Sequence, residues 1–365
     1  MPEPFKNIFS EKMVKDLASL LKPQDDGFKE KSFVEYVLRD FEALELKARV
    51  NRIAEALGEF LPGDFRQNTF MLLKIKDNFP SLRGVIFPAY VAMKGLSQKD
   101  FDFSMKALGE FTKGSSSEFG VRPFIQFDLS RALGFMEKWA KSSDTDLRRL
   151  SSEGLRPRLP WGGTLWPLVE DPSKVLKILE LLLKDKELYV RKSVANNLND
   201  ISKDHPDLIV TFIQKHLGNN HLTDWILKRG ARTLIKKKDP KILSLFGYLL
   251  KEDPKNILQS KSIKVRPKEL KIGENIEISY SLEMKKNFTG LMRLECMVDY
   301  PLTSKRKSSK LFFIKELELS GVKKVSGKKS LQFKNFSTHT QVPGVHKLKV
   351  LLNGVLLEKF SFTLR

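Results

Sequence analysis

Three carboxylates stand out in this sequence because each has a basic or aromatic residue close by. They are Glu118 with Arg122, Glu153 with Arg149, and Asp200 with Tyr189 and Lys192. A carboxylate that faces a sugar can stabilise the positive charge that grows at C1′ as an N-glycosidic bond breaks, as in glycoside hydrolysis. For any one of the three, an ion pair that only orients an arginine is the more common role. The residues therefore leave two interpretations open, one catalytic and one structural.

A second group of residues has the types and spacing of a phosphate-binding surface. On a helix spanning residues 225–236, one face would carry Trp225, Arg229, Arg232 and Lys236, and the opposite face Leu227, Ala231 and Leu234. Cationic side chains hold phosphates, and an indole ring can lie against a sugar or a base. An ordinary solvated face, with the tryptophan packed in a neighbouring groove, fits the same spacing equally well.

Both groups lie in a repeated helical pattern. In residues 188–213 the apolar stripe is Val190, Val194, Leu198 and Ile201, and the polar front is Tyr189, Lys192, Asn196 and Asp200. Pro206 ends the first helix because proline supplies no N–H. The pattern returns 36 residues later, in residues 225–235 with a second arm at 241–250, and a weaker copy lies in residues 146–155. A period near 40 with two helices per unit predicts HEAT- or armadillo-like stacking with a curved front.

The rest of the first 257 residues also predicts helices. Apolar spacing indicates them in residues 13–21, 33–57, 70–74, 101–111 and 124–139, and residues 1–110 predict a packed helical cap without chemistry. The three serines before Glu118 predict a turn and an N-cap region. Residues 156–172 hold four prolines, two tryptophans and a Gly-Gly pair, so no regular helix is expected there. An aromatic-rich loop within a helical array is more often functional than a plain connector.

Near Leu258 the apolar period changes from helical to alternating. Strands are predicted in residues 290–300, 311–319, 328–336, 346–353 and 355–364, and the first alternation begins at Val265. Asn353-Gly354 is a strong signal for a hairpin turn. Six or seven short strands predict an immunoglobulin-like antiparallel sandwich, although the Cys…Trp…Cys hallmark is missing. The fold class is therefore α+β in two domains, a helical solenoid in residues 1–257 and a β-sandwich in residues 258–365.

The chain of 365 residues carries a formal net charge of +21. Residues 261–365 contribute 22 Lys and Arg against 9 Asp and Glu, and their densest cluster includes Lys305, Arg306 and Lys307. A field of one sign favours a polyanion, nucleic acid first and an anionic membrane second. A basic protein without such a partner is not excluded by charge alone.

The sequence gives no support for a metal site, a cofactor site or a membrane-spanning segment. The single cysteine, Cys296, allows no disulfide within the chain, and the five histidines show no metal-binding spacing. The N-terminus lacks the apolar region of a signal peptide, and the longest apolar stretch is too short to span a bilayer. We therefore expect a cytoplasmic protein without metal or cofactor.

Four segments in order resemble the AlkC-type DNA glycosylases, HEAT-repeat relatives of AlkD. They read SSEFGVRPF, RRLSSEGLRPRLPWG, YVRKSVANNLNDISKDHPD and WILKRGARTLI. The resemblance covers nearly the whole chain and extends to the Ig-like appendage of the longer AlkC subtype. It implies hydrolytic excision of cationic bases such as 3-methyladenine, and also 3-methylcytosine, from duplex DNA without a base-flipping pocket. It implies a monomer without an obligate protein partner.

The resemblance also assigns roles to residues. Glu118, Glu153, Trp161 and Asp200 would line the lesion, with Arg149 beside them. DNA contacts are expected from Arg149, Arg156, Lys192, Trp225, Arg229, Arg232 and Lys236, and from Lys305, Arg306 and Lys307 as a clamp. No lysine stands out as a Schiff-base nucleophile, so no lyase step is expected. The main alternative is a HEAT-repeat DNA-binding scaffold without catalysis, and the next is a scaffold for an anionic membrane or a protein.

Overall fold

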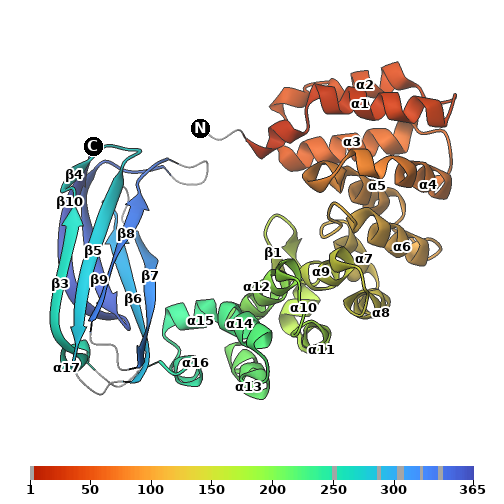
Figure 1. Cartoon of the computed structure of the whole chain (residues 1–365). Coiled ribbons are helices and arrows are strands. Elements are labelled where there is room, and N and C mark those ends of the chain that lie inside the picture. The colour runs from red at the N-terminus through yellow and green to blue at the C-terminus, as the bar shows by residue number, and fades with distance from the viewer. Residues whose placement is uncertain (1–3, 249–252, 286–288, 302–307, 321–323, 336–339) are drawn as a thin grey trace. The chain divides into compact units, whose positions relative to one another are not determined.

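The computed structural model describes residues 4–248, 253–285, 289–301, 308–320, 324–335 and 340–365. It divides into two compact units, Met1–Thr233 and Leu234–Arg365. The first unit is helical and the second is mainly β, and each is described by itself (Figure 1). The predicted Lys305, Arg306 and Lys307 clamp lies outside the described residues.

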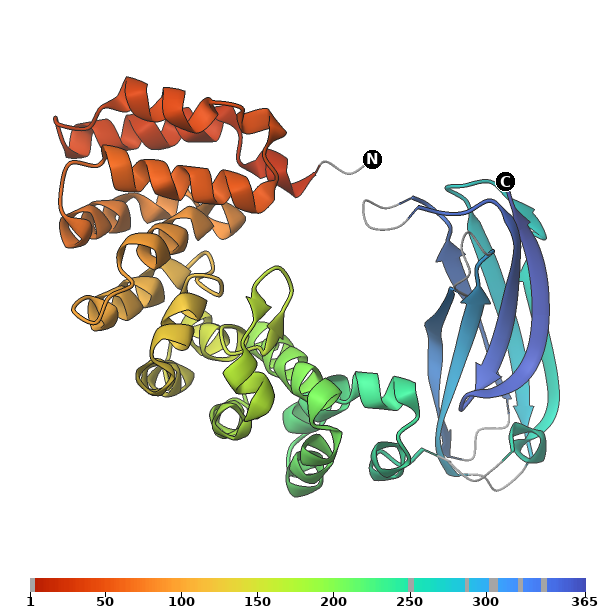
Figure 2. The same ribbon diagram turned by 180° about the vertical axis from the view of Figure 1, so that it is seen from behind.

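Helices fill the first unit and stack as successive layers (Figures 1 and 2). They are α1 (Glu11–Leu21), α2 (Glu30–Leu38), α3 (Leu46–Phe60), α4 (Phe65–Ile75), α5 (Ile86–Lys94), α6 (Phe101–Thr112), α7 (Val121–Phe127), α8 (Leu129–Ala140), α9 (Thr145–Glu153), α10 (Trp166–Glu170), α11 (Ser173–Leu181), α12 (Leu188–Asp204), α13 (Pro206–His216) and α14 (His221–Gly230). Short 3₁₀ turns η1 (Phe5–Ile8), η2 (Lys22–Gln24), η3 (Phe41–Ala43), η4 (Lys76–Asn78) and η5 (Ser81–Val85) connect some of them. Helix α15 (Arg232–Lys237) runs into the second unit.

The predicted hairpin of residues 188–213 is confirmed as α12 and α13. The four apolar residues of the stripe, Val190, Val194, Leu198 and Ile201, are all buried. Pro206 lies in the first turn of α13, where backbone N–H groups have no partner within the helix, so its lack of an N–H costs no hydrogen bond. Helix α12 packs against α9 on one side and α14 on the other. It therefore lies at the centre of the layers that carry the candidate site.

Three predicted helices are broken where a side chain or turn interrupts the backbone ladder. Residues 33–57 divide into α2 and α3 at Asp40, whose φ is 55°. Residues 124–139 divide at Asp128, whose side chain accepts a hydrogen bond from the Arg131 N–H and starts α8. Residues 225–235 divide at Ala231. Because Asn199 Oδ1 accepts the Thr233 N–H at 3.1 Å, that N–H is not available to continue α14 into α15.

Residues 156–172 are more regular than predicted. Strand β1 (Arg158–Leu159) pairs with β2 (Gly163–Thr164), and the turn between them holds Trp161 at φ 63°. The five-residue helix α10 then follows, contrary to the expectation of no helix. Pro167 lies in its first turn, where a proline is tolerated because no donor is needed there.

The second unit is an Ig-like sandwich of two sheets. Helices α16 (Pro240–Leu245) and α17 (Pro254–Ile257) precede strands β3 (Leu258–Arg266), β4 (Glu269–Leu270), β5 (Asn275–Met284), β6 (Thr289–Asp299), β7 (Ser309–Ser320), β8 (Lys324–Gln332), β9 (Gly344–Leu352) and β10 (Val355–Leu364). The sheets have the orders β4-β10-β9-β6-β7 and β3-β5-β8. The short β4–β10 pair is parallel, which corrects the all-antiparallel prediction.

Alternate strand residues meet between the two sheets and form the core of this unit. Ile276 and Ile278 of β5 face Leu294 and Val350 there, and the free thiol of Cys296 is buried among them. The predicted hairpin turn at Asn353-Gly354 is confirmed, with φ values of 47° and 76° that match a tight turn between β9 and β10. The period-two pattern therefore predicted the sheet faces, and the Asn353-Gly354 pair predicted the last turn.

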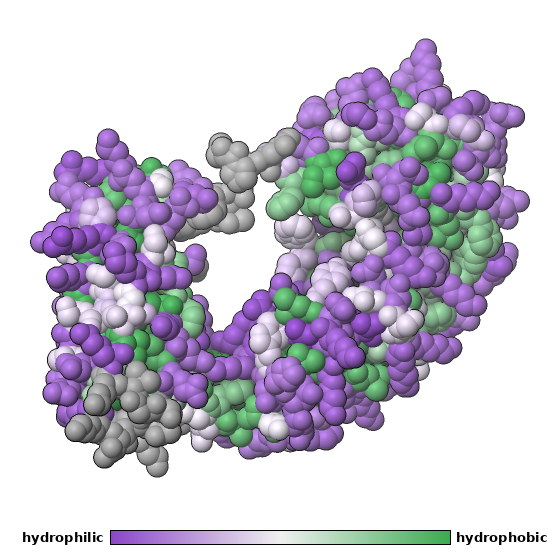
Figure 3. Space-filling view, viewed as in Figure 1, coloured by the Kyte–Doolittle hydropathy of each residue, from purple (hydrophilic) through white to green (hydrophobic). Residues whose placement is uncertain are grey.

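Hydrophilic residues cover much of the face shown in Figure 3, and hydrophobic patches interrupt them on both units. In the part of the chain that the structure describes, no helix combines the length and apolar character needed to cross a bilayer. Among the same residues, no group of three or more His, Cys, Asp and Glu side chains is placed to hold a metal ion.

Candidate active site

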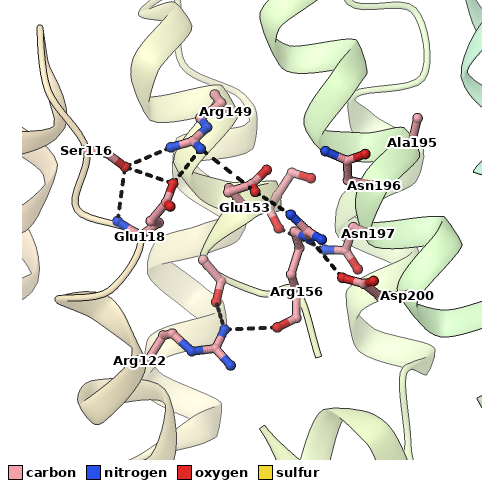
Figure 4. A network of polar contacts seen from close by, with 12 residues as sticks. Ser116, Glu118, Arg122, Arg149, Glu153, Arg156, Ala195, Asn196, Asn197 and Asp200 are labelled. Carbon is pink, nitrogen blue, oxygen red and sulfur yellow. Dashed lines mark hydrogen bonds and ion pairs between the residues drawn. The ribbon is translucent and has the colours of Figure 1, made fainter. Parts of the chain in front are cut away.

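The carboxylates singled out in the sequence come together in one network of polar contacts within the helical unit (Figure 4). Glu118 lies in the turn before α7, Glu153 ends α9, and Asp200 lies on α12. Asp144 caps the start of α9 by accepting the Leu147 N–H at 3.0 Å. Because α9 packs between α8 and α12, residues more than 80 positions apart in the chain converge at one site.

Arginines alternate with the carboxylates in a continuous chain of ion pairs. Arg149 pairs with Glu118 and lies 3.8 Å from Glu153. Arg156 Nη1 contacts Glu153 Oε1 at 2.7 Å, and its Nε contacts Asp200 Oδ2 at 2.8 Å. Each carboxylate therefore has an arginine partner, as expected if the carboxylates only orient arginines. The pairs also join into one site, as expected if the carboxylates act together.

Two residues extend this chain at its ends. Ser116 Oγ accepts from Arg149 Nη1 at 2.8 Å and donates to Glu118 Oε2 at 3.0 Å. Lys203 Nζ contacts Asp200 Oδ1 at 2.8 Å. Neither residue was predicted to belong to the site, although Ser116 is one of the three serines predicted to form a turn before Glu118. An ion pair between Asp200 and Lys203 could have been predicted, because the two residues are three positions apart on a helix. The role of Ser116 could not, because it depends on Arg149 of α9 lying beside it in the fold.

Burial makes these ion pairs stronger than surface ones. As whole residues, Glu153 is 6% exposed and Asp200 only 1%, so the predicted polar front of α12 is covered by protein at Asp200. Arg156 fills the space in front of it. Burial alone would lower the pKa of the Arg156 guanidinium, but the Asp200 and Glu153 carboxylates raise it above its ordinary value. The same balance, with Glu118 and Glu153 as partners, raises the pKa of Arg149.

Arg122 has a different role from the one its sequence position suggested. It donates to four backbone carbonyls, from Nε to Gly162 (3.0 Å), from Nη1 to Gly154 (3.3 Å) and Arg156 (2.9 Å), and from Nη2 to Gly163 (2.7 Å). Burial, followed by the charge of Arg156, lowers the pKa of Arg122 to about 10. Arg122 therefore ties the β1–β2 turn to the residues that follow α9.

Trp161 lies at the tip of that turn and is 62% exposed. Its carbonyl accepts a hydrogen bond from Lys47 Nζ of α3 at 2.7 Å. Hydrogen bonds from Arg122 and from Lys47 to backbone carbonyls thus fix the turn, while the indole ring of Trp161 remains exposed to solvent. An exposed large aromatic side chain on a doubly anchored turn fits a ligand contact better than a core position.

The predicted phosphate-binding residues divide into two groups. Trp225, 37% exposed, lies under the guanidinium groups of Arg229, 5.5 Å from the ring centroid, and Arg191, 5.7 Å away. The sequence did not predict Arg191 as part of this group, because its contact with Trp225 is between two different helices, α12 and α14. Lys192 is exposed on α12, and Lys236 is exposed on α15 in the second unit.

Arg232 is partly buried and is hydrogen-bonded within its own unit. Its Nη2 donates to Asn196 Oδ1 at 3.1 Å, and its Nη1 donates to the Arg229 carbonyl at 2.9 Å. Burial, and next the charge of Arg229, lower the pKa of Arg232. The break before α15 thus ties Arg232 to the α12–α14 junction, and its predicted DNA contact remains untested.

Comparisons with known proteins find matches to both the helical part and the Ig-like part of the chain. A family model for a DNA alkylation repair enzyme matches residues 115–234, and a model for the C-terminal Ig-like domain of the uncharacterised protein YhaZ matches residues 259–365. The chain is 36% identical to the uncharacterized protein YhaZ of Bacillus subtilis (strain 168), over 98% of both chains. It is 32% identical to the alkylpurine DNA glycosylase AlkC of Pseudomonas fluorescens bound to DNA containing an abasic site analog, with a TM-score of 0.89 over 100% of both chains.

Proposed function

Because this chain belongs to the AlkC-type family of DNA alkylation repair enzymes, we propose that it is a DNA glycosylase for cationic N-alkylated bases in duplex DNA. The substrates are 3-methyladenine and 3-methylcytosine. The observation that carries the proposal is the buried chain of carboxylates and arginines at Glu118, Glu153 and Asp200, within the residues that match the repair-enzyme model.

The reaction needs little acid catalysis because the base is already cationic. As the N-glycosidic bond breaks, its electron pair neutralises the base and positive charge develops at C1′ of the sugar. The carboxylates stabilise that charge in a site where they are already oriented by Arg149 and Arg156. A water molecule then adds to C1′ and loses a proton to a carboxylate, which completes hydrolysis without a lysine adduct.

The side chains of the three carboxylates differ in accessibility. Glu118 is 15% exposed, Glu153 8% and Asp200 2%. Glu118 is therefore the carboxylate most able to meet the sugar directly. Asp200 contributes its negative charge at short range and also holds Arg156 against Glu153. Trp161, with its exposed indole, contacts the lesion from the β1–β2 turn.

DNA binding rests on the positive charge of the chain and on the Arg191–Trp225–Arg229 group. Two guanidinium groups within about 6 Å of one indole ring bring two positive charges close together, which suits a phosphodiester backbone. The Ig-like unit, in which basic residues outnumber acidic ones, is proposed as a second DNA contact. The lesion stays in the duplex without entering a base-flipping pocket, and the protein acts as a monomer.

The direct test is release of free base from duplex DNA treated with a methylating agent. We expect 3-methyladenine to appear faster than by spontaneous depurination, leaving abasic sites that are cleaved only when a separate endonuclease is added. Release at the spontaneous rate, together with salt-sensitive DNA binding, would instead identify a HEAT-repeat scaffold without catalysis.

A further inference from the structure

An apolar groove of about 340 Å³ opens beside the candidate site, within the helical unit. Helices α3 and α5, the turn before α7 and the tip of the β1–β2 turn form its walls. Val50, Ala89, Ala92 and Phe119 are among its lining residues, and Trp161 stands at its rim. This volume is in the range of pockets that bind small organic groups.

The groove and the carboxylate site share residues. Ser116 lines the groove and is hydrogen-bonded to both Glu118 and Arg149, so one wall of the groove is also the edge of the ion-pair chain. Trp161 lines the groove and is the aromatic residue assigned to the lesion. A base held at the carboxylates would therefore lie next to the groove entrance.

The charges around the groove differ from those of the carboxylate site. Lys47 is a lining residue; its Nζ donates to the Trp161 carbonyl and lies 6.0 Å from the centre of the Phe119 ring. None of the described residues that line the groove carries a carboxylate. A cationic base is therefore attracted to the carboxylates and repelled by Lys47, whereas an uncharged hydrocarbon group gains from burial in the groove.

We propose that this groove receives the uncharged arm of N-alkyl substituents larger than methyl, so that the enzyme also removes cationic bases with bulky apolar groups such as benzyl. The inference rests on the proposed glycosylase function and adds a substrate class to it. The cationic ring stays at the carboxylates, the scissile bond is unchanged, and only the arm enters the space between α3, α5 and Phe119.

The experiment compares release of 3-methyladenine and 3-benzyladenine from otherwise identical duplexes. Ala92→Phe places a ring in the groove, because the partly exposed Ala92 side chain lines it from α5. Ala89→Leu fills the same space with less bulk. Ser19→Phe, at an exposed position on α1, is the matched control for an added aromatic ring.

Wild type and Ser19→Phe are expected to release both bases. Ala92→Phe should slow benzyladenine release roughly ten-fold or more, as expected when a pocket loses space for several carbon atoms, while methyladenine release changes less than about two-fold. Ala89→Leu should show the same selectivity to a smaller degree.

Four results would overturn the inference. Methyladenine release without benzyladenine release by wild type would mean that the arm has no site, although the glycosylase function would stand. Equal slowing of both bases in the folded filling variants would indicate that DNA itself, such as a displaced base, occupies the groove. No slowing of either base would mean that the groove is not used, and failure of wild type to release even methyladenine would contradict the proposed function as well.

Discussion

Arg122 offers the sharpest test of how the site is built, because it acts on backbone carbonyls and not on a carboxylate. The replacement Arg122→Lys keeps the positive charge but loses the planar fork of donors. A lysine ammonium at the end of a shorter chain can reach one or two of the four carbonyls now bound, at Gly154, Arg156, Gly162 and Gly163.

The magnitude follows from those lost bonds. Each hydrogen bond from a charged donor contributes about 1.5–3 kcal/mol, and two of the four lie in part-buried positions where water can substitute. Losing two buried bonds therefore lowers the free energy of unfolding by about 3–6 kcal/mol. For a helical unit of this size, about 2–4 °C per kcal/mol gives a fall in melting temperature of roughly 6–24 °C.

Activity should respond in a particular way. Because the β1–β2 turn carries Trp161, loosening it should lower kcat by about 10- to 100-fold, as small misplacements of reacting groups do, while DNA affinity changes little. Calorimetry and single-turnover base release at a temperature where the variant is folded measure the two effects. Arg131→Lys, in an exposed pair with Asp102, is the matched control and should cost less than about 1 kcal/mol. A variant at Arg122 that is as stable and as active as wild type would refute the role given to this residue.

Two further predictions concern DNA binding and the β unit. Arg229→Ala should reduce the dependence of log K on log salt by about 0.9, the value for one phosphate contact. Trp225→Ala should weaken DNA binding without changing that slope, because it removes no charge and the Asp185 and Lys186 carbonyls still hold Arg191. An unchanged slope for Arg229→Ala in binding titrations would exclude Arg229 from the interface. Burial lowers the pKa of His346 below its ordinary value of 6.5, so the unfolded chain takes up the proton first and the β unit should lose stability as pH falls below about 6.5. His346→Phe, in a position that already stacks on Phe362, should remove that pH dependence in urea unfolding, and an unchanged dependence would assign it to other groups.

Sequence periodicity predicted the stripes and strand faces that bury large areas. The α12 stripe from Val190 to Ile201 and the turn at Asn353-Gly354 were both readable because their signals are local. The break at Ala231 was not, because it depends on Asn199 of another helix accepting the Thr233 N–H. The parallel β4–β10 pair likewise joins segments about 90 residues apart and leaves no mark in either strand.

The sequence predicted which carboxylates form the candidate site but not which arginines they pair with. Glu118, Glu153 and Asp200 were named, and the structure brings them together, but spacing suggested Arg122 as the partner of Glu118 where the structure has Arg149. Asp200 was placed on the polar front of the helix, with no indication of its burial, because helical periodicity reports only the angle around the helix. Periodicity does not show that a long side chain from another segment, here Arg156, will pack over Asp200 and bury it.

The carboxylates are the centre of the proposed chemistry, and the most direct measurement is single-turnover release of 3-methyladenine by Glu153→Gln and Asp200→Asn. Glu180→Gln, which alters a surface pair with Lys215, is the matched control. We predict that release by the two site variants falls about 100-fold or more, as when one preorganised charge is removed from an active site, while DNA affinity and folding at the assay temperature are retained. Wild-type rates in both folded variants would mean that these carboxylates only hold arginines in place, and the account of catalysis given above would be wrong.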